Sequence, residues 1–290
     1  MAKEIRYTTA VDTDGNLIHV NDAEKGTEYF CPECKEKLIL KKSGKSGPGS
    51  RRPHFTHYEL THNCTPEGVL HISFKRMLVE HLEKCITEYI KIPITWTCET
   101  CAHKNTGNLL EKVASVREEY QLGVCRPDIA LLDKNGQIIA VIEIVVTHQP
   151  EENALQYYQD NRIALIQINL TSEEELLRIP ARIQKPDLVD YCMNSRCTNN
   201  SRYNIQRYVA NQPILCARCL VTRIERYFVK LDGIFGAGES RDFTDSEIDF
   251  VKSKRTNIQV TTDPKTKEKY PRFNCPVCGV NGRGYRSRIF

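Results

Sequence analysis

The chain has 290 residues, with 41 lysines and arginines, 37 aspartates and glutamates, and a net charge of +4. This length suits two domains or one elaborated domain, and so small a charge is a weak argument for nucleic-acid binding. No apolar run is long enough to cross a membrane, and the N-terminus lacks the features of a secretory signal. We therefore expect a cytoplasmic protein that does not enter a membrane.

The thirteen cysteines indicate bound metal. Their odd number and their spacings do not favour disulfides, and thiols stay reduced in the cytoplasm. Four pairs have the Cys-x-x-Cys spacing of metal sites, and they are Cys31/Cys34, Cys98/Cys101, Cys216/Cys219 and Cys275/Cys278.

Residues 1–66 are predicted to form a small zinc-knuckle module. The Cys31–Cys34 turn points two thiolates at one ion, and two ligands from His54, His57 and Cys64 would complete a tetrahedral zinc site. The alternative is that both histidines are surface residues and that the cysteine pair binds no metal.

A helix is predicted from Pro66 to about Ile90, with Thr65 as its N-cap. Glu67, His71 and Lys75 follow one another at single-turn intervals, within or beside the apolar stripe, so they would point toward the interior. Alternatively, the first two turns extend beyond the core, and Glu67 only favours the helix dipole. The expected buried stripe consists of Leu70, Phe74, Met77, Leu78, Leu82, Cys85 and Tyr89.

A second cysteine pair, Cys98 and Cys101, follows an extended segment over residues 91–97. Its partners would be His103, Cys125 or the C-terminal cysteines. Residues 113–121 alternate like a strand. One of their two glutamates, Glu118 or Glu119, could approach a site in the core, or both could be surface residues.

A hairpin is predicted around Asn135-Gly136, because this dipeptide is a strong turn signal between two apolar segments. A two-residue loop would place Asp128 directly opposite Glu143, and a four-residue loop would place the two acids diagonally on the same face. Two carboxylates inside apolar strands require a counter-charge, and a divalent cation is the simplest one.

After the hairpin, the sequence predicts a helix over residues 151–160 and a buried strand over residues 161–170. A second helix should begin at Ser172, and Pro180 should stop or kink it. These elements predict an α/β core with a mixed sheet flanked by helices. The predicted domains are residues 1–66, a core over 67–185 with a Cys-x-x-Cys insertion at 98–101, and a cysteine-rich module over 186–290.

The order of these motifs resembles the PD-(D/E)xK nuclease superfamily and, within it, the competence protein CoiA-like family. The resemblance rests on the Cys-Pro-x-Cys knuckle with His54 and His57, and on the Glu67-x3-His71-x3-Lys75 helix. It also rests on Arg126-Pro-Asp128, Ile142-Glu-Ile144 and Thr147-His148, and it covers roughly residues 25–170.

The resemblance implies a restriction-endonuclease-like core with Mg²⁺ or Mn²⁺ held by Asp128, Glu143 and the carbonyl of Ile144. It also implies Glu67 as an additional catalytic acid and His71 as a contact to phosphate or water. Arg126, Thr147 and His148 are further candidates for contacting phosphate or supporting the metal ligands. The departure is Val145, which occupies the place of the motif lysine, so Lys75 would have to supply that ammonium.

The C-terminal module contains Cys192 and Cys197, and eighteen residues separate this pair from Cys216 and Cys219. This spacing predicts a four-cysteine zinc ribbon. The Cys275/Cys278 pair would either join Cys98 and Cys101 or replace one half of the ribbon.

Two regions carry the features of a nucleic-acid contact. Residues 41–52 carry five positive charges in a loop that suits a phosphate backbone or serves as a solvated linker. Arginines and tyrosines interleave around the C-terminal cysteines, a pattern that suits phosphate contact and base stacking, or an ordinary module surface. Their positions are Arg202, Tyr203, Arg207, Tyr208, Arg223, Arg226, Tyr227, Arg283, Tyr285, Arg286 and Arg288.

The sequence thus predicts a metal-dependent nuclease acting on DNA, with two or three structural zinc ions in modules that position the nucleic acid. One alternative is a DNA-binding or DNA-processing protein that keeps the nuclease fold without turnover. Another is a factor whose zinc modules recruit a protein partner.

Overall fold

The computed structural model describes residues 6–42, 52–59, 64–194, 196–203, 205–216, 218–221, 223–240, 242–254, 258–279 and 281–282. The chain divides into two compact units, Met1–Tyr191 and Cys192–Phe290. Within the described residues, no helix combines the length and the apolar character needed to cross a membrane.

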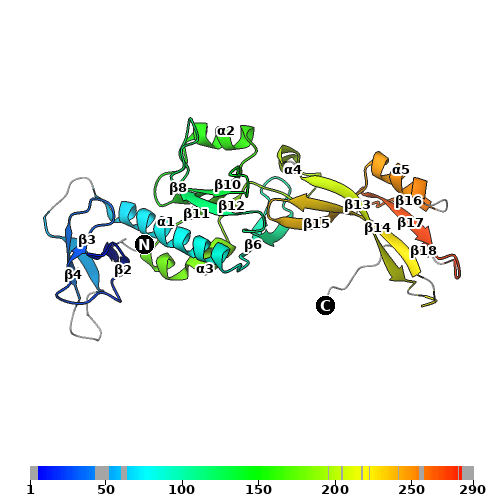
Figure 1. The fold of residues 1–290 in the computed structure, drawn as a ribbon. Coiled ribbons are helices and arrows are strands. Elements are labelled where there is room, and N and C mark those ends of the chain that lie inside the picture. The colour runs from blue at the N-terminus through cyan, green and yellow to red at the C-terminus, as the bar shows by residue number, and fades with distance from the viewer. Residues whose placement is uncertain are drawn as a thin grey trace. The chain divides into compact units, whose positions relative to one another are not determined.

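The first unit opens with a small antiparallel sheet whose strand order is β2-β1-β3-β4-β5 (Figure 1). Ala10, Tyr29, Leu38 and Phe55 are buried in its core. The core therefore lies against the Cys31–Cys34 turn that follows β3. The strands are β1 (Thr9–Val11), β2 (Leu17–His19), β3 (Tyr29–Phe30), β4 (Lys37–Lys41) and β5 (His54–His57).

Helix α1 (Pro66–Thr87) begins where the sequence predicts, because the Thr65 hydroxyl accepts the Gly68 amide at 3.0 Å. Most of the predicted stripe is buried, with Met77 only half-buried. Tyr89 was wrongly placed in it: the helix ends at Thr87, and Tyr89 is 93% exposed. The helix is fixed to the first sheet by a buried contact of 2.6 Å between the hydroxyls of Ser73 and Thr9.

The central sheet has the order β12-β11-β10-β9-β8. β10 and β11 are parallel and the other pairs are antiparallel, so the predicted mixed sheet is confirmed. In Figure 1, α2 covers one face, and α1 and α3 lie on the other. Its elements are β8 (Ser115–Glu118), β9 (Ile129–Leu132), β10 (Ile138–Val145), α2 (Glu152–Asp160), β11 (Ala164–Asn169), η1 (Glu173–Arg178), α3 (Ile179–Gln184) and β12 (Leu188–Val189).

The β9–β10 hairpin sets the register of the two acids. Leu132 pairs with Ile138, so the loop is longer than either predicted loop, but a register shift between Ile138 and Ala140 compensates. The ladder then runs to the Ile129–Ile142 pair. Asp128 and Glu143 are the next facing positions. This is the pairing that we expected from a two-residue loop, but here a β-bulge in β10 produces it.

Pro180 neither stops nor kinks the second helix in the predicted way. The 3₁₀ helix η1 ends at Arg178, and Pro180 lies in the first turn of α3. This position tolerates proline because the first-turn amide has no partner within the helix. The chain therefore turns at the junction of two short helices.

A two-stranded hairpin, β6 (Pro93–Thr97) and β7 (Lys104–Asn108), carries the Cys98–Cys101 turn. The side chain of Trp96 fixes this hairpin to the end of the first unit, because its indole N–H donates to the carbonyl oxygen of Tyr191 at 2.6 Å.

The second unit is built on a long antiparallel hairpin, β13–β14, extended by β15. Its core contains Val229, Leu231, Phe243, Ile248 and Val251. Its elements are α4 (Thr198–Arg202), β13 (Gln206–Leu215), β14 (Arg223–Gly233), β15 (Gly236–Ser240), α5 (Asp245–Lys254), β16 (Ile258–Thr262), β17 (Lys269–Asn274) and β18 (Asn281–Gly282).

Candidate metal and catalytic sites

The N-terminal Cys/His group consists of Cys31, Cys34, His57 and Cys64, whose ligand atoms lie within 4.8 Å of one another. The Sγ atoms of Cys31 and Cys64 are 3.4 Å apart, and Cys34 Sγ is 3.2 Å from His57 Nε2. Three sulfurs and one imidazole match a structural zinc site. This group could therefore bind structural zinc. Two of its ligands, His57 and Cys64, come from the three candidates that the sequence indicated.

His54 is not part of this group, so the two ligands from the three candidates are His57 and Cys64. His54 and His57 are three residues apart on β5, and side chains at that spacing point to opposite faces of a strand. His54 Nδ1 instead lies 2.9 Å from the carbonyl oxygen of Arg52.

The C-terminal Cys group consists of Cys216, Cys219, Cys275 and Cys278. Sγ distances of 3.6 Å (Cys216–Cys278) and 3.7 Å (Cys219–Cys275) show that the turns face each other. The first turn joins β13 to β14, and the second joins β17 to β18. The four thiols could hold one structural zinc ion.

This arrangement corrects the predicted ribbon, in which Cys192 and Cys197 would have completed a site with Cys216 and Cys219. Cys275 and Cys278 take that role, so of the two alternatives for this pair, replacement of one half of the ribbon is confirmed. Sequence spacing could not decide, because a ribbon pairs two hairpin turns regardless of how much chain separates them.

The four Cys-x-x-Cys turns have the same backbone geometry. In each, the residue after the second cysteine has a positive φ, and its amide donates to the carbonyl of the first cysteine at 2.8–3.0 Å. These residues are Lys35, Ala102, Leu220 and Gly279. The Cys98–Cys101 turn thus has the local form of the turns in the two groups above. Cys98, Cys101, Cys192 and Cys197 belong to neither group, and their role as zinc ligands stays a prediction.

The acid pair, Asp128 and Glu143, lies where the β9–β10 ladder ends. Asp128 Oδ2 accepts the amide of Ile144 at 2.9 Å and lies 3.0 Å from His71 Nε2. Since the N–H and C=O of one strand residue point to the same side, the carbonyl of Ile144 is directed to the same edge. The register brings two carboxylates and one carbonyl to one place.

The environment gives the two acids opposite pKa shifts. Burial, together with the nearby Asp128, raises the pKa of Glu143 to about 7, against the lowering effect of the Tyr158 hydroxyl. Burial also opposes the ionisation of Asp128, but His71, the amide of Ile144 and Lys75 together lower its pKa. One carboxyl therefore stays ionised while its neighbour holds a proton near neutral pH, which is what an acid pair without a cation does.

Lys75 reaches the acid pair from α1, as the sequence predicts. It is 4% exposed, and its Nζ lies 3.7 Å from Asp128 Oδ1 and 2.5 Å from Glu119 Oε1. Glu119 also pairs with Arg126 at 3.2 Å, and the hydrogen bond from Lys75 lowers the pKa of Glu119. Glu119 is exposed and also contacts Lys75, so both positions that the sequence left open for it apply, and its backbone has a positive φ.

Tyr158 was not anticipated as a site residue. It is 2% exposed on α2, and its hydroxyl donates to Glu143 Oε1 at 2.5 Å. The available sequence signal was its place on the apolar face of the helix, one turn after Ala154, where a hydroxyl needs a buried acceptor.

A pocket of about 470 Å³ opens beside the acid pair. It is lined by many of the predicted residues, His71, Arg126, Asp128, Glu143, Ile144 and His148. Val145 also lines it and contributes an apolar side chain. Among the residues that the structure describes, Glu67, Lys75 and Thr147 are not in its wall. Thr147 Oγ1 instead lies 2.8 Å from Nδ1 of His148 and so orients that ring.

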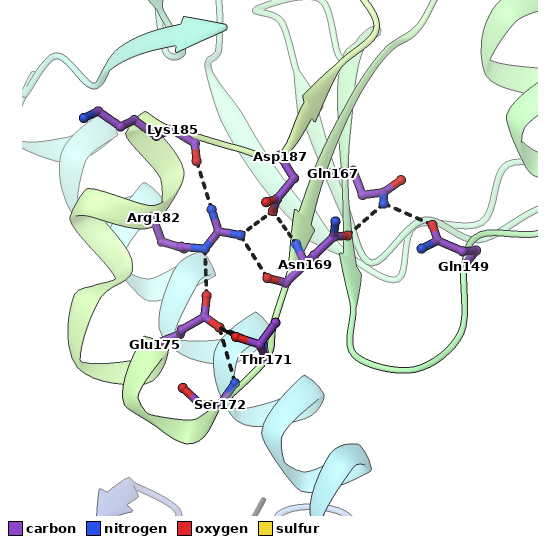
Figure 2. Close-up of polar contacts among 9 residues, drawn as sticks. All are labelled: Gln149, Gln167, Asn169, Thr171, Ser172, Glu175, Arg182, Lys185 and Asp187. Carbon is purple, nitrogen blue, oxygen red and sulfur yellow. Dashed lines mark hydrogen bonds and ion pairs between the residues drawn. The ribbon is translucent and has the colours of Figure 1, made fainter. Parts of the chain in front are cut away.

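A network of hydrogen bonds and ion pairs links Gln149, which lines the pocket, to β11 and to the segment after it (Figure 2). Gln149 lines the pocket, and its Oε1 accepts from Gln167 Nε2, which also donates to Asn169 Oδ1. Arg182 donates to the carbonyl of Asn169 and to the carboxylates of Glu175 and Asp187. The guanidinium therefore ties the end of β11 to η1 and to the chain after α3.

The predicted nucleic-acid contacts are only partly visible. Of the basic loop, residues 43–51 lie outside the described residues, and so do Arg283, Tyr285, Arg286 and Arg288. In the second unit, Arg207 pairs with Glu247 at 3.0 Å, and the Arg226 guanidinium stacks 5.7 Å above the Phe228 ring. These two arginines have intramolecular partners, which favours the module-surface interpretation for them.

A family model described as "Competence protein CoiA, N-terminal domain" matches residues 16–67. Over these residues the chain is similar to the N-terminal domain of CoiA. The match contains the whole N-terminal Cys/His group and ends in the first turn of α1. It supports the predicted membership in the competence protein CoiA-like family and is consistent with a competence-related protein. The acid pair lies outside the matched residues. No curated protein and no solved structure matched the chain.

Proposed function

We propose that this CoiA-like chain is a metal-dependent nuclease that hydrolyses phosphodiester bonds of DNA, with a core of the PD-(D/E)xK type. The observation that carries the proposal is the buried acid pair at the wall of a pocket. Asp128 and Glu143 face each other, and the pKa of Glu143 is raised to about 7. Such a pair suits a divalent cation, which removes the repulsion between the carboxylates.

The donor set fits Mg²⁺ or Mn²⁺. Asp128, Glu143 and the carbonyl of Ile144 would hold the ion through oxygen atoms, and the remaining positions would be left to water and phosphate. When bound, such an ion lowers the pKa of a water molecule and stabilises charge on phosphate oxygens.

The surrounding side chains would handle the phosphate and the protons. His71 holds Asp128 and lines the pocket, while Arg126 and His148 lie in the wall where a phosphate would bind. Lys75 brings an ammonium to 3.7 Å from Asp128 Oδ1 and would provide the positive charge that Val145 cannot. Glu67 would act only if substrate binding brought it closer, since it is not in the pocket wall.

The zinc groups would position the nucleic acid. The N-terminal group fixes the segment that enters α1, which carries His71 and Lys75, and the C-terminal group stabilises a ribbon at the end of the β13–β14 hairpin. The positively charged residues 41–52 would contact the phosphate backbone.

One observation favours a second candidate, a DNA-binding protein of the same fold without turnover. Val145 lines the pocket, and Lys75, the only cation proposed to replace the motif lysine, is buried between Glu119 and Asp128. Such a protein would bind DNA and the cation but release no product.

Incubation of the zinc-loaded protein with labelled DNA and Mg²⁺ or Mn²⁺ separates the two candidates. The nuclease proposal expects metal-dependent cleavage that Asp128→Ala and Glu143→Ala abolish, and that Lys75→Met lowers by about 100-fold or more. Cleavage that persists in both acid variants would refute the proposal. Salt-sensitive DNA binding without products would favour the second candidate.

A further inference from the structure

Helix α2 brings one polar side chain to the acid pair. Tyr158 packs in a cluster with Val141, Ala154 and Leu165, so its ring is fixed between α2 and the central sheet. Its hydroxyl is the part that leaves the apolar cluster, and it donates to Glu143 Oε1 at 2.5 Å. The same side chain lines the pocket.

The two acids are held in matching ways. On Asp128, the oxygen Oδ2 accepts the amide of Ile144 and faces His71. On Glu143, the oxygen Oε1 accepts the hydroxyl of Tyr158. In each carboxylate, a protein donor thus fixes one oxygen and sets the direction of the other. Asp128 Oδ1, which lies 3.7 Å from Lys75 Nζ, and Glu143 Oε2 are the oxygens that would coordinate an ion.

We propose that Tyr158 is the positioning residue of the cation site, which holds Glu143 so that its Oε2 alone coordinates a divalent ion. The inference rests on the cation site of the proposed function and adds α2 to it. A carboxylate with one oxygen held by a hydroxyl cannot rotate freely, so less entropy is lost when the ion binds.

A simpler role for Tyr158 would be to fill the space between helix and sheet. Phenylalanine would fill that space equally well, so the hydroxyl distinguishes the two roles. Tyr157, its neighbour on α2, is a half-buried member of the same cluster and offers a matched control for the loss of one hydroxyl.

The test measures binding of Mn²⁺ and Mg²⁺ to the zinc-loaded full chain by titration calorimetry, at one pH and without DNA. We expect Tyr158→Phe to weaken binding by about 10–100-fold, the usual effect of removing a group that orients a metal ligand. Tyr157→Phe should bind as the unmodified protein does. Equal zinc content and an equal melting temperature in both variants would show that the fold is intact.

Three results would overturn the inference in distinguishable ways. Unchanged affinity in Tyr158→Phe would refute the role of Tyr158 and leave the cation site standing. Absence of binding by the unmodified protein, or binding that survives Asp128→Ala, would refute the cation site and the inference with it. If the DNA-cleavage rate of Tyr158→Phe stayed low even in excess Mn²⁺, a role of Tyr158 in metal binding alone would also be contradicted.

Discussion

The N-terminal Cys/His group and the C-terminal Cys group offer similar ligands in different surroundings. The first lies in a core that contains Ala10, Tyr29 and Phe55, and its last ligand, Cys64, directly precedes the N-cap of α1. The second has a very small core, in which Cys216 and Cys275 are the buried residues.

We infer from this difference that a zinc ion would have a different structural role in each group. The C-terminal ribbon has few apolar contacts of its own, so its fold should depend on the metal. The N-terminal sheet has a core, and its metal should mainly fix the start of the helix that carries His71 and Lys75.

The largest effect is expected when the C-terminal group is broken. The double substitution Cys216→Ser and Cys219→Ser should release one zinc ion and unfold the ribbon, because metal binding supplies about 10–16 kcal/mol in small zinc domains. Elemental analysis and limited proteolysis around residues 206–282 would measure both losses. Cys85→Ala, which removes a buried cysteine outside both groups, should keep the zinc content. An intact ribbon without zinc would contradict the comparison.

The next prediction uses the two histidines of β5. His57→Gln should remove the N-terminal zinc and weaken Mn²⁺ binding at the acid pair, because the entry of α1 loses its anchor. His54→Gln should change neither quantity, since His54 lies outside the group. Zinc analysis and calorimetry on the two variants provide the measurement. If His57→Gln lost zinc but bound Mn²⁺ normally, the link between this group and α1 would be refuted.

The start of α1, the acid pair and the C-terminal Cys group show what could be predicted from the sequence. Thr65 and Asn135-Gly136 act on neighbouring residues, so α1 and the facing of Asp128 and Glu143 followed from local chemistry. Even there, a bulge at β10 replaced the expected loop. The C-terminal pairing was only one of two alternatives for Cys275 and Cys278, because it depends on which hairpin turns meet in three dimensions.

The side chains that support the acid pair illustrate the same limit. Tyr158 and Glu119 reach the site only after α2 packs on the sheet and the backbone of Glu119 adopts a left-handed conformation. The sequence left open whether Glu119 approaches the site or lies at the surface, and it did not indicate Tyr158. Ligands on one hairpin can thus be predicted, whereas the residues that orient them require the packed fold.

A pH dependence should follow from Glu143. Because folding raises its pKa from 4.5 to about 7, the folded state binds a proton more tightly than the unfolded state. The metal-free protein should therefore lose about 1–3 kcal/mol of stability as the pH rises from 4.5 to above 7. Mg²⁺ binds the ionised form, so its stabilising effect should grow over the same interval. Denaturant titrations at several pH values, with and without Mg²⁺, would measure this, and Glu143→Gln should remove both trends.

The smallest effect is expected at the contact between the Cys31–Cys34 turn and the start of α1. Glu33, between Cys31 and Cys34, accepts the Thr65 amide at 3.3 Å, and a Cβ on Gly68 would lie 2.4 Å from its Oε1. Gly68→Ala must therefore displace the carboxylate from the helix N-terminus, which costs about 0.5–1 kcal/mol. Alanine also gains about 1 kcal/mol over glycine within a helix, so the net change should be close to zero.

In the Glu33→Ala background, the carboxylate is gone, and Gly68→Ala should stabilise the protein by about 1 kcal/mol. A double-mutant cycle from urea unfolding would therefore give a coupling of about 0.5–1 kcal/mol between the two positions. A coupling of zero would mean that Glu33 does not hold the entry of α1. The N-terminal group would then act on the helix through Cys64 alone, because this ligand is joined to the N-cap residue by a single peptide bond.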